Sequence, residues 1–146
     1  MKMTSTGEVS LAMSASSSSL LAPISPGELL DKIAILEVKL ARIHDPDKLT
    51  SIRTELKLLR LAAKDGIAEH LWDRLGPLLV GLYLVNGVIF DLLERQRQLD
   101  REGRFDQEFI TLSRSVYIEN DRRAALKRQI DDLLGSPIRE EKHYPA

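Results

Sequence analysis

Apolar side chains recur three or four residues apart along residues 26–44, which is the spacing of one face of an α-helix. The segment Ser25-Pro26-Gly27-Glu28 precedes this run and carries the signals of a helix start. The Ser25 hydroxyl can accept a hydrogen bond from the Glu28 N–H, and the Glu28 carboxylate can accept one from the Ser25 N–H. Proline is favourable at the first helical position, because the N–H group that it lacks would have no partner within the helix there. We therefore predict a helix from Pro26 to His44, with a buried stripe formed by Leu29, Ile33, Leu36, Leu40 and Ile43.

The same start signal returns at Asp45-Pro46, and a second apolar stripe follows at Leu49, Ile52, Leu56 and Leu59. We predict that this second helix ends at Lys64-Asp65-Gly66. The link between the two helices is so short that they must pack as an antiparallel hairpin.

A third apolar stripe covers residues 67–100 and is interrupted at Gly76-Pro77. Because proline lacks an N–H and clashes with the preceding turn, we predict that the third helix is kinked or split there. A fourth helix should run from Asp106 to Leu134 and end at a left-handed Gly135. No segment alternates apolar and polar residues as a strand does. The pattern therefore predicts an all-α fold, an antiparallel helical bundle of four main helices.

Outside these periodic segments the chain divides into a tail and one domain. Residues 1–22 contain four consecutive serines and no helical period, so we predict a disordered serine-rich tail in which Met13 is an alternative start. The tail lacks the continuous apolar run of a signal peptide. Residues 23–146 suit a single helical-bundle domain whose last residues, 136–146, form an extended C-terminal segment.

Composition narrows the classes of function. The chain has 146 residues, a net charge of −1 at pH 7 and no cysteine. The near-neutral charge argues against a nucleic-acid partner, and the lack of cysteine excludes disulfides, thiolate metal sites and cysteine nucleophiles. The apolar run over residues 78–90 is shorter than the roughly 20 residues of a membrane span and contains Asn86. We therefore expect a cytoplasmic protein without a membrane span.

Polar residues interrupt the apolar stripe of the predicted fourth helix after Val116. Arg114 and Tyr117 share one face, and Asn120 or Asp121 follows one turn later. An anion-binding site uses this combination, because arginine makes bidentate contacts while tyrosine and asparagine orient the ligand. A buried polar cluster that fixes the register of the helices is the alternative. The histidines lack the spacing of a metal site and no nucleotide motif is present, so we expect no metal and no cofactor.

Four stretches of the chain resemble a bacterial family of uncharacterised short helical proteins. They are residues 21–37 (LAPISPGELLDKIAILE), 105–110 (FDQEFI), 113–124 (SRSVYIENDRRA) and 135–144 (GSPIREEKHY). Members of that family are domains of unknown function, and some are similar to regions that accompany glycosyltransferases or repeat proteins of the cell surface. The resemblance therefore implies a helical fold but no established catalytic residues.

The resemblance draws attention to polar residues of the first and fourth helices. If these helices pack side by side, Asp31 and Lys32 lie close to Arg114 and Asn120. The C-terminal segment, with Glu140, Glu141 and Tyr144, can then fold back over them. The candidate ligand-binding residues are Glu28, Asp31, Lys32, Arg114, Tyr117, Asn120 and Arg123.

Two classes of function remain open. The first is a helical-bundle protein for interaction or assembly with a partner protein, linked to a bacterial surface-polysaccharide or glycosyltransferase pathway. We expect a homodimer, because helices of about 35–43 Å overhang helices of about 28 Å, and the overhang needs coiled-coil packing against a second copy. The alternative is a small metabolite-binding module or enzyme that acts on a phosphorylated or carboxylated substrate.

Overall fold

The computed structural model describes residues 18–143, which form four α-helices, one short 3₁₀-helix and no strand. The α-helices are α2 (Pro26–Arg42), α3 (Pro46–Gly66), α4 (Trp72–Arg101) and α5 (Gln107–Leu134). The 3₁₀-helix η1 (Glu69–Leu71) lies between α3 and α4. The prediction of an all-α bundle with four main helices is confirmed.

The helix-start signals act as predicted, with one difference. Ser25 Oγ accepts a hydrogen bond from the Glu28 N–H at 3.1 Å, and the Asp45 side chain accepts from the first N–H groups of α3. The Glu28 carboxylate, which was predicted to bind the Ser25 N–H, lies 2.6 Å from the Lys127 Nζ. The ammonium group of Lys127 is buried and needs negative charges beside it. The Glu28 carboxylate is therefore stabilised more by an ion pair with Lys127 than by a hydrogen bond from the Ser25 N–H.

Helix α4 runs through Gly76-Pro77 without a split. It is continuous from Trp72 to Arg101, and the break in this part of the chain lies earlier, at η1. Pro77 falls in the second turn, where it removes one backbone hydrogen bond close to the helix start. Leu75 and Leu82, on either side of the proline, are fully buried in the core. Their packing offsets the cost of the proline and keeps the helix whole.

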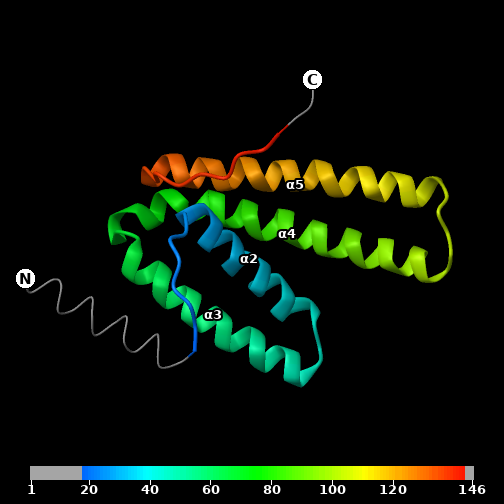
Figure 1. Ribbon diagram of the computed structural model, residues 1–146, viewed down its shortest axis with the longest axis horizontal. Coiled ribbons are helices and arrows are strands. Elements are labelled where there is room, and N and C mark those ends of the chain that lie inside the picture. The colour runs from blue at the N-terminus through cyan, green and yellow to red at the C-terminus, as the bar shows by residue number, and fades with distance from the viewer. Residues whose placement is uncertain (1–17, 144–146) are drawn as a thin grey trace, which may run out of the picture.

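Helix α2 lies at the centre of the fold. It packs against α3 on one side and against both α4 and α5 on the other, whereas α3 packs mainly against α2. Helices α4 and α5 form a long antiparallel pair that extends past the end of α2 (Figure 1). The pair of α2 and α3 is the predicted hairpin, and its short link contains the Asp45 cap.

The apolar core lies where the four helices meet. Its side chains come from every α-helix and include Leu30, Leu56, Leu75, Leu82 and Ile130. Away from this core, residues 92–118 form a two-helix arm, made of the end of α4, the connecting turn and the start of α5 (Figure 1). Leu99 is fully buried in the arm, so the contact between α4 and α5 continues to its far end.

The two terminal segments differ in how much of them is described. The predicted tail, residues 1–22, lies mostly outside the described residues. Met13 and Tyr144 also lie outside them. Residues 136–143 have no helix or strand and run back along α5 (Figure 1). Glu140 lies 2.7 Å from Lys127 and Glu141 lies 3.1 Å from Arg128, so ion pairs attach this segment to α5.

Candidate functional site

Four polar side chains are buried where α2 meets α4 and α5. They are Asp31, Asn86, Lys127 and Asp131, and each is between 2% and 6% exposed. Asp31 belongs to the buried face of α2, Asn86 to that of α4, and the other two lie one turn apart on α5. Every buried side-chain nitrogen or oxygen within the described residues has a hydrogen-bond partner. Full pairing matters because a half-satisfied buried network costs more stability than an apolar core.

The Asn86 amide connects the three helices. Its Nδ2 donates to Asp31 Oδ1 and to the Leu82 carbonyl oxygen, both at 2.9 Å. Its Oδ1 accepts from Arg123 Nη1 at 3.4 Å, and Arg123 Nε lies 3.9 Å from Asp31 Oδ2. These contacts hold the guanidinium on one side only. Its remaining N–H groups have no acceptor among residues 18–143, so Arg123 can bind a further group.

Lys127 forms the second part of the network. Its Nζ lies 2.6 Å from Glu28 Oε2, 2.7 Å from Glu140 Oε2 and 4.0 Å from Asp31 Oδ2. Three carboxylates, from α2 and from the C-terminal segment, therefore surround one ammonium group. Lys127 is therefore fully paired, and its contact with Glu140 holds the C-terminal segment against the helices.

A close backbone approach completes the network at the start of α2. The Gly27 N–H donates to Asp131 Oδ1 at 2.7 Å. A Cβ atom on Gly27 would lie 2.4 Å from the Lys127 carbonyl oxygen. Glycine is required here because α2 and α5 approach more closely than a side chain permits. The glycine of the helix-start signal thus also sets the distance between the two helices.

Burial and pairing shift the pKa values of the network. Burial raises the pKa of the Asp31 carboxyl, and this effect exceeds the lowering by the Asn86 hydrogen bond and by Arg123. Burial lowers the pKa of Lys127, but its hydrogen bonds to Glu140 and other nearby negative charges outweigh burial, and the net pKa is raised. The hydrogen bond from Lys127 lowers the pKa of Glu140. The Lys127–Glu140 ion pair is therefore charged at neutral pH.

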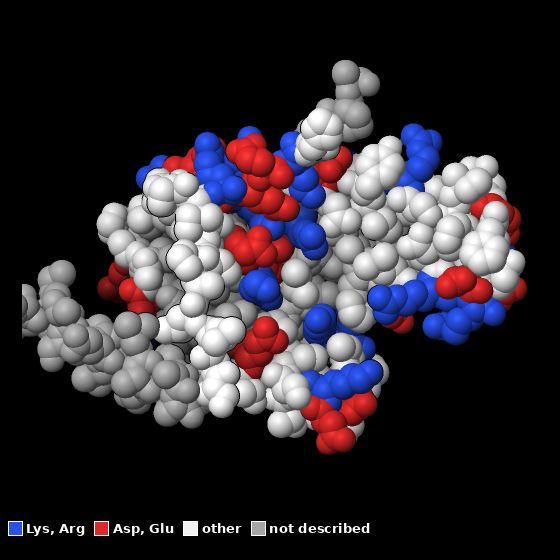
Figure 2. All heavy atoms as spheres, in the orientation of Figure 1, with Lys and Arg blue, Asp and Glu red and all other residues white. Residues whose placement is uncertain are grey.

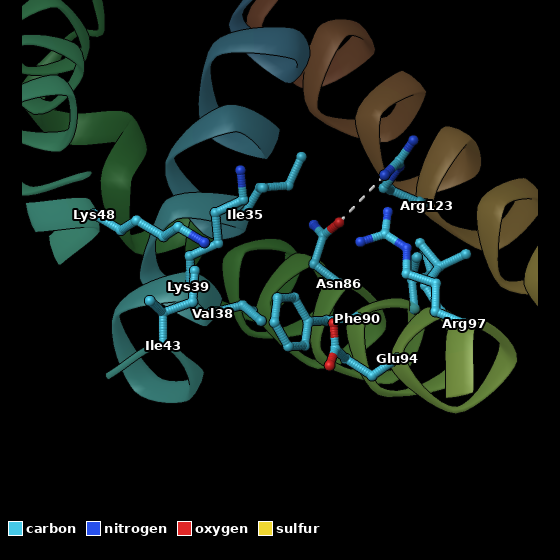
Figure 3. A pocket seen from close by; sticks show the side chains of 12 residues that line it. Ile35, Val38, Lys39, Ile43, Lys48, Asn86, Phe90, Glu94, Arg97 and Arg123 are labelled. Atoms are coloured by element: carbon cyan, nitrogen blue, oxygen red, sulfur yellow. Dashed lines mark hydrogen bonds between the residues drawn. The ribbon is translucent and has the colours of Figure 1, made fainter. Parts of the chain in front are cut away.

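A pocket of about 470 Å³ opens beside Asn86 and Arg123 (Figure 3). Its floor is apolar and consists of Ile35, Val38, Ile43, Ile89, Phe90 and Leu93. Its charged lining consists of Lys39, Lys48, Glu94, Arg97 and Arg123. The volume falls in the range of small-molecule sites, which are mostly apolar and carry a few placed polar groups.

The pocket carries an excess of positive charge. Lys39, Lys48 and Arg97 form no ion pair with any residue between 18 and 143, and Arg123 reaches Asp31 only at 3.9 Å. Glu94 is the one acid in the lining of this pocket. Unpaired cations beside an apolar floor attract an anion that carries an apolar body.

Three of the predicted site residues lie together in the structure: Glu28, Asp31 and Arg123. Arg123 contacts Asp31 directly at 3.9 Å, and Lys127 and Asn86 provide the remaining links among the three. The expectation that the C-terminal segment folds back over the first and fourth helices agrees with the contact of Glu140.

The other four predicted residues lie elsewhere. Lys32 and Arg114 are exposed and have no ion pair within the described part of the chain. Tyr117 is 54% exposed, and the Asn120 amide donates to the Val116 carbonyl oxygen of its own helix at 3.0 Å. The grouping of Asp31 and Lys32 with Arg114 and Asn120 is therefore not found, because α2 meets α5 nearer to the C-terminal end of α5.

Most of the network and the pocket were not predicted from the sequence. Arg123, Lys127 and Asp131 recur four residues apart, so a continuous polar face on α5 was visible in the sequence. Asn86 was visible as the polar residue in the apolar run of α4. For Lys39, Lys48 and Arg97 no sequence signal distinguishes a pocket wall from an ordinary solvated face. Their part in the site depends on how three helices are rotated against one another.

The described residues also bear on metal binding and on membrane insertion. Within them, no group of three or more His, Cys, Asp or Glu side chains is placed to hold a metal ion. The helical stretch Glu69–Arg101 is long and apolar enough to cross a membrane by length and composition, a test that a core helix also passes. In this fold it packs against α2 and α5.

Comparisons with protein-family models, with curated proteins and with solved structures find no match to this chain. The resemblance to bacterial short helical proteins therefore stays a prediction. The pocket and its polar network provide the basis for a functional proposal.

Proposed function

We propose that this protein binds a small amphipathic anion in the pocket between α2, α4 and α5. The proposal rests on an apolar floor beside four basic side chains, three of which have no carboxylate partner among residues 18–143. A bound carboxylate or phosphate gains charge-assisted hydrogen bonds, and its apolar body covers the floor around Phe90. This is the ligand-binding alternative predicted from the sequence, at a site that shares only Arg123 with the predicted one.

Arg123 is the anchor of the proposed site. Asn86 and Asp31 hold its guanidinium at the edge of the pocket, and Figure 3 shows the dashed Asn86–Arg123 bond beside the cavity. A side chain that is already held loses less conformational entropy when it binds a ligand. Its planar fork matches the two oxygens of a carboxylate or phosphate.

A titration with arginine variants tests this function. We expect carboxylates and phosphates with alkyl or aryl bodies to bind saturably in calorimetry, and Arg97→Ala to weaken binding by about 1.5–3 kcal/mol, the usual value for a hydrogen bond to a charged group. Arg114→Ala is the matched control, because it removes an exposed arginine of another long helix outside the pocket.

Two results would reject the proposed site. One is the absence of saturable binding by any compound of the panel to the unaltered protein. The other is an equal loss of affinity in Arg97→Ala and Arg114→Ala. That second result would favour a site that includes Arg114, as predicted from the sequence.

Self-association through the arm is a second candidate function, favoured by the surface of residues 92–118. Helices α4 and α5 have 30 and 28 residues, whereas α2 and α3 have 17 and 21, so the arm extends beyond its neighbours. Its exposed apolar side chains include Phe105, Ile110, Tyr117 and Ile118, between 38% and 61% exposed. Figure 2 shows a broad area without charged side chains over this end of the molecule. A second copy of the arm would cover such a surface.

Sedimentation equilibrium tests this second function. We expect a dimer that Ile110→Lys dissociates, because a charge in an apolar interface is costly. Leu61→Lys is the matched control, since Leu61 is also 49% exposed but lies on α3. A protein that stays monomeric at about 100 μM, well above a micromolar dissociation constant, would exclude a stable dimer. An equal effect of both substitutions would exclude the arm as the interface.

A further inference from the structure

The basic side chains of the pocket come from two opposite walls. In Figure 3, Lys39 and Lys48 enter from the side of α2 and the start of α3. Arg97 and Arg123 enter from the side of α4 and α5, and Phe90 lies between the two pairs. The pocket therefore has a cationic end, an apolar middle and a second cationic end.

We infer that the ligand of this pocket is a dianion with one anionic group at each end of an apolar body. This inference depends on the proposed function, because it requires the pocket to be a ligand site. A single anionic group pairs with one cationic end and leaves the other end unpaired. A second anionic group at the far end pairs with the remaining cations, and it does so at high effective concentration because the first contact already holds the ligand.

The two ends differ in how they recognise an anion. At the arginine end, Arg123 is held by Asn86 and Asp31, so its guanidinium presents a positioned fork that orients a carboxylate or a phosphate. Lys39 and Lys48 have no ion pair within residues 18–143 and are point charges on flexible stems. The arginine end therefore sets the orientation of the ligand, and the lysine end adapts to its length.

Glu94 limits the charge of the ligand. Its side chain lies next to Phe90 in Figure 3, on the α4 side of the pocket. A third anionic group placed over Phe90 would lie near this carboxylate and be repelled. Removal of that repulsion by Glu94→Gln should leave the preference for two charged ends unchanged and reduce discrimination against a central charge.

A length series of ligands tests the inference. The probes are linear α,ω-dicarboxylates and α,ω-diphosphonates of about four to ten carbons, each compared by calorimetry with the monoanion of the same length. We expect affinity to pass through a maximum at one chain length. At that length the dianion should bind at least about tenfold more tightly than its monoanion.

A double variant tests the lysine end separately. Lys39→Ala with Lys48→Ala should reduce the affinity of the best dianion to no more than that of its monoanion, so that the roughly tenfold preference for the dianion is lost. Lys57→Ala with Lys64→Ala is the matched control, because both are exposed lysines of α3 outside this pocket. Unchanged dianion binding in the first double variant would overturn the assignment of the lysine end.

The length series also separates failure of this inference from failure of the proposed function. If monoanions bind saturably and as tightly as dianions at every length, the inference is wrong and the proposed function stands. If neither series binds saturably to the unaltered protein, the proposed function is wrong and the inference fails with it.

Discussion

Substitution of Gly27 by alanine tests whether the distance between α2 and α5 is as short as the structure shows. The added Cβ atom would lie 2.4 Å from the Lys127 carbonyl oxygen and 2.8 Å from Asp131 Oδ1. Ordinary van der Waals contact begins at 3.4 Å. The closer of the two atoms belongs to the backbone of α5, which cannot rotate away as a flexible side chain can. The two helices must therefore separate by about 1 Å.

The cost of this separation has two parts. Forcing one extra carbon atom into a packed contact typically costs about 1–3 kcal/mol. The separation also strains the buried bond from the Gly27 N–H to Asp131 Oδ1, and an unsatisfied buried group costs about 1–3 kcal/mol. We therefore expect Gly27→Ala to lower the free energy of unfolding by about 2–6 kcal/mol, a large part of the stability of a small domain.

Urea unfolding followed by far-UV circular dichroism measures this difference. Gly66→Ala is the matched control, because a Cβ at Gly66, the last residue of α3, would have no neighbour within 4 Å. That control should be neutral or stabilising by up to about 1 kcal/mol. Asp131→Ala removes the hydrogen bond without the clash and should cost about 1–3 kcal/mol. If Gly27→Ala costs no more than Gly66→Ala, the close approach of α2 and α5 is refuted.

Three further predictions concern the network and the core. Thermal unfolding from about pH 7 to about pH 3 should show that Glu140→Gln reduces the acid sensitivity of folding and that Glu141→Gln reduces it less. The pKa of Glu140 is lower in the folded chain than its ordinary value of 4.5, so its contribution to stability is present above that value and is lost as the pH falls below it. The Leu99 side chain is fully buried, so Leu99→Ala should lower the free energy of unfolding in urea by about 2–5 kcal/mol. Leu84 is 60% exposed, so Leu84→Ala should lower it by less than about 0.5 kcal/mol. Equal losses in the two variants would contradict the packing of the arm. Asn86→Ala should cost about 1–3 kcal/mol and weaken anion binding, and unchanged affinity would show that its contact does not position the arginine.

Most of the secondary structure was predictable because helix starts and ends depend on local chemistry. Ser25 and Asp45 cap the helices that their side chains predict, and Gly135 ends α5 with φ at 66°. These bonds form between residues no more than a few positions apart, so they do not depend on the rest of the fold. The exception is Pro77, where the sequence predicted a kink or a split. The helix is not split there, because the packing around Pro77 outweighs the tendency of proline to end a helix.

The candidate site was predictable only in part. Glu28, Asp31 and Arg123 were identified from the sequence, whereas Lys127, their central partner, was not. Arg114 was expected to face α2 but is exposed to solvent. Polar residues on one helix face are easy to recognise, but the residues opposite them lie up to about a hundred positions away in the chain, as Gly27 and Asp131 do.

The sequence by itself therefore determined the all-α class, the four main helices and their capped ends, since each depends on periodicity and on caps within a few residues. It did not determine the start of α4, which has no side-chain cap. The tertiary structure decided which charges lie together. It placed α2 between α3 and the pair of α4 and α5, and it buried Lys127 among three carboxylates. It also left Lys39, Lys48 and Arg97 of the pocket without an ion pair among residues 18–143. The physical reason is that the axial rotation and spacing of packed helices follow from contacts between distant residues, such as that of Gly27 with α5, and no local pattern encodes them.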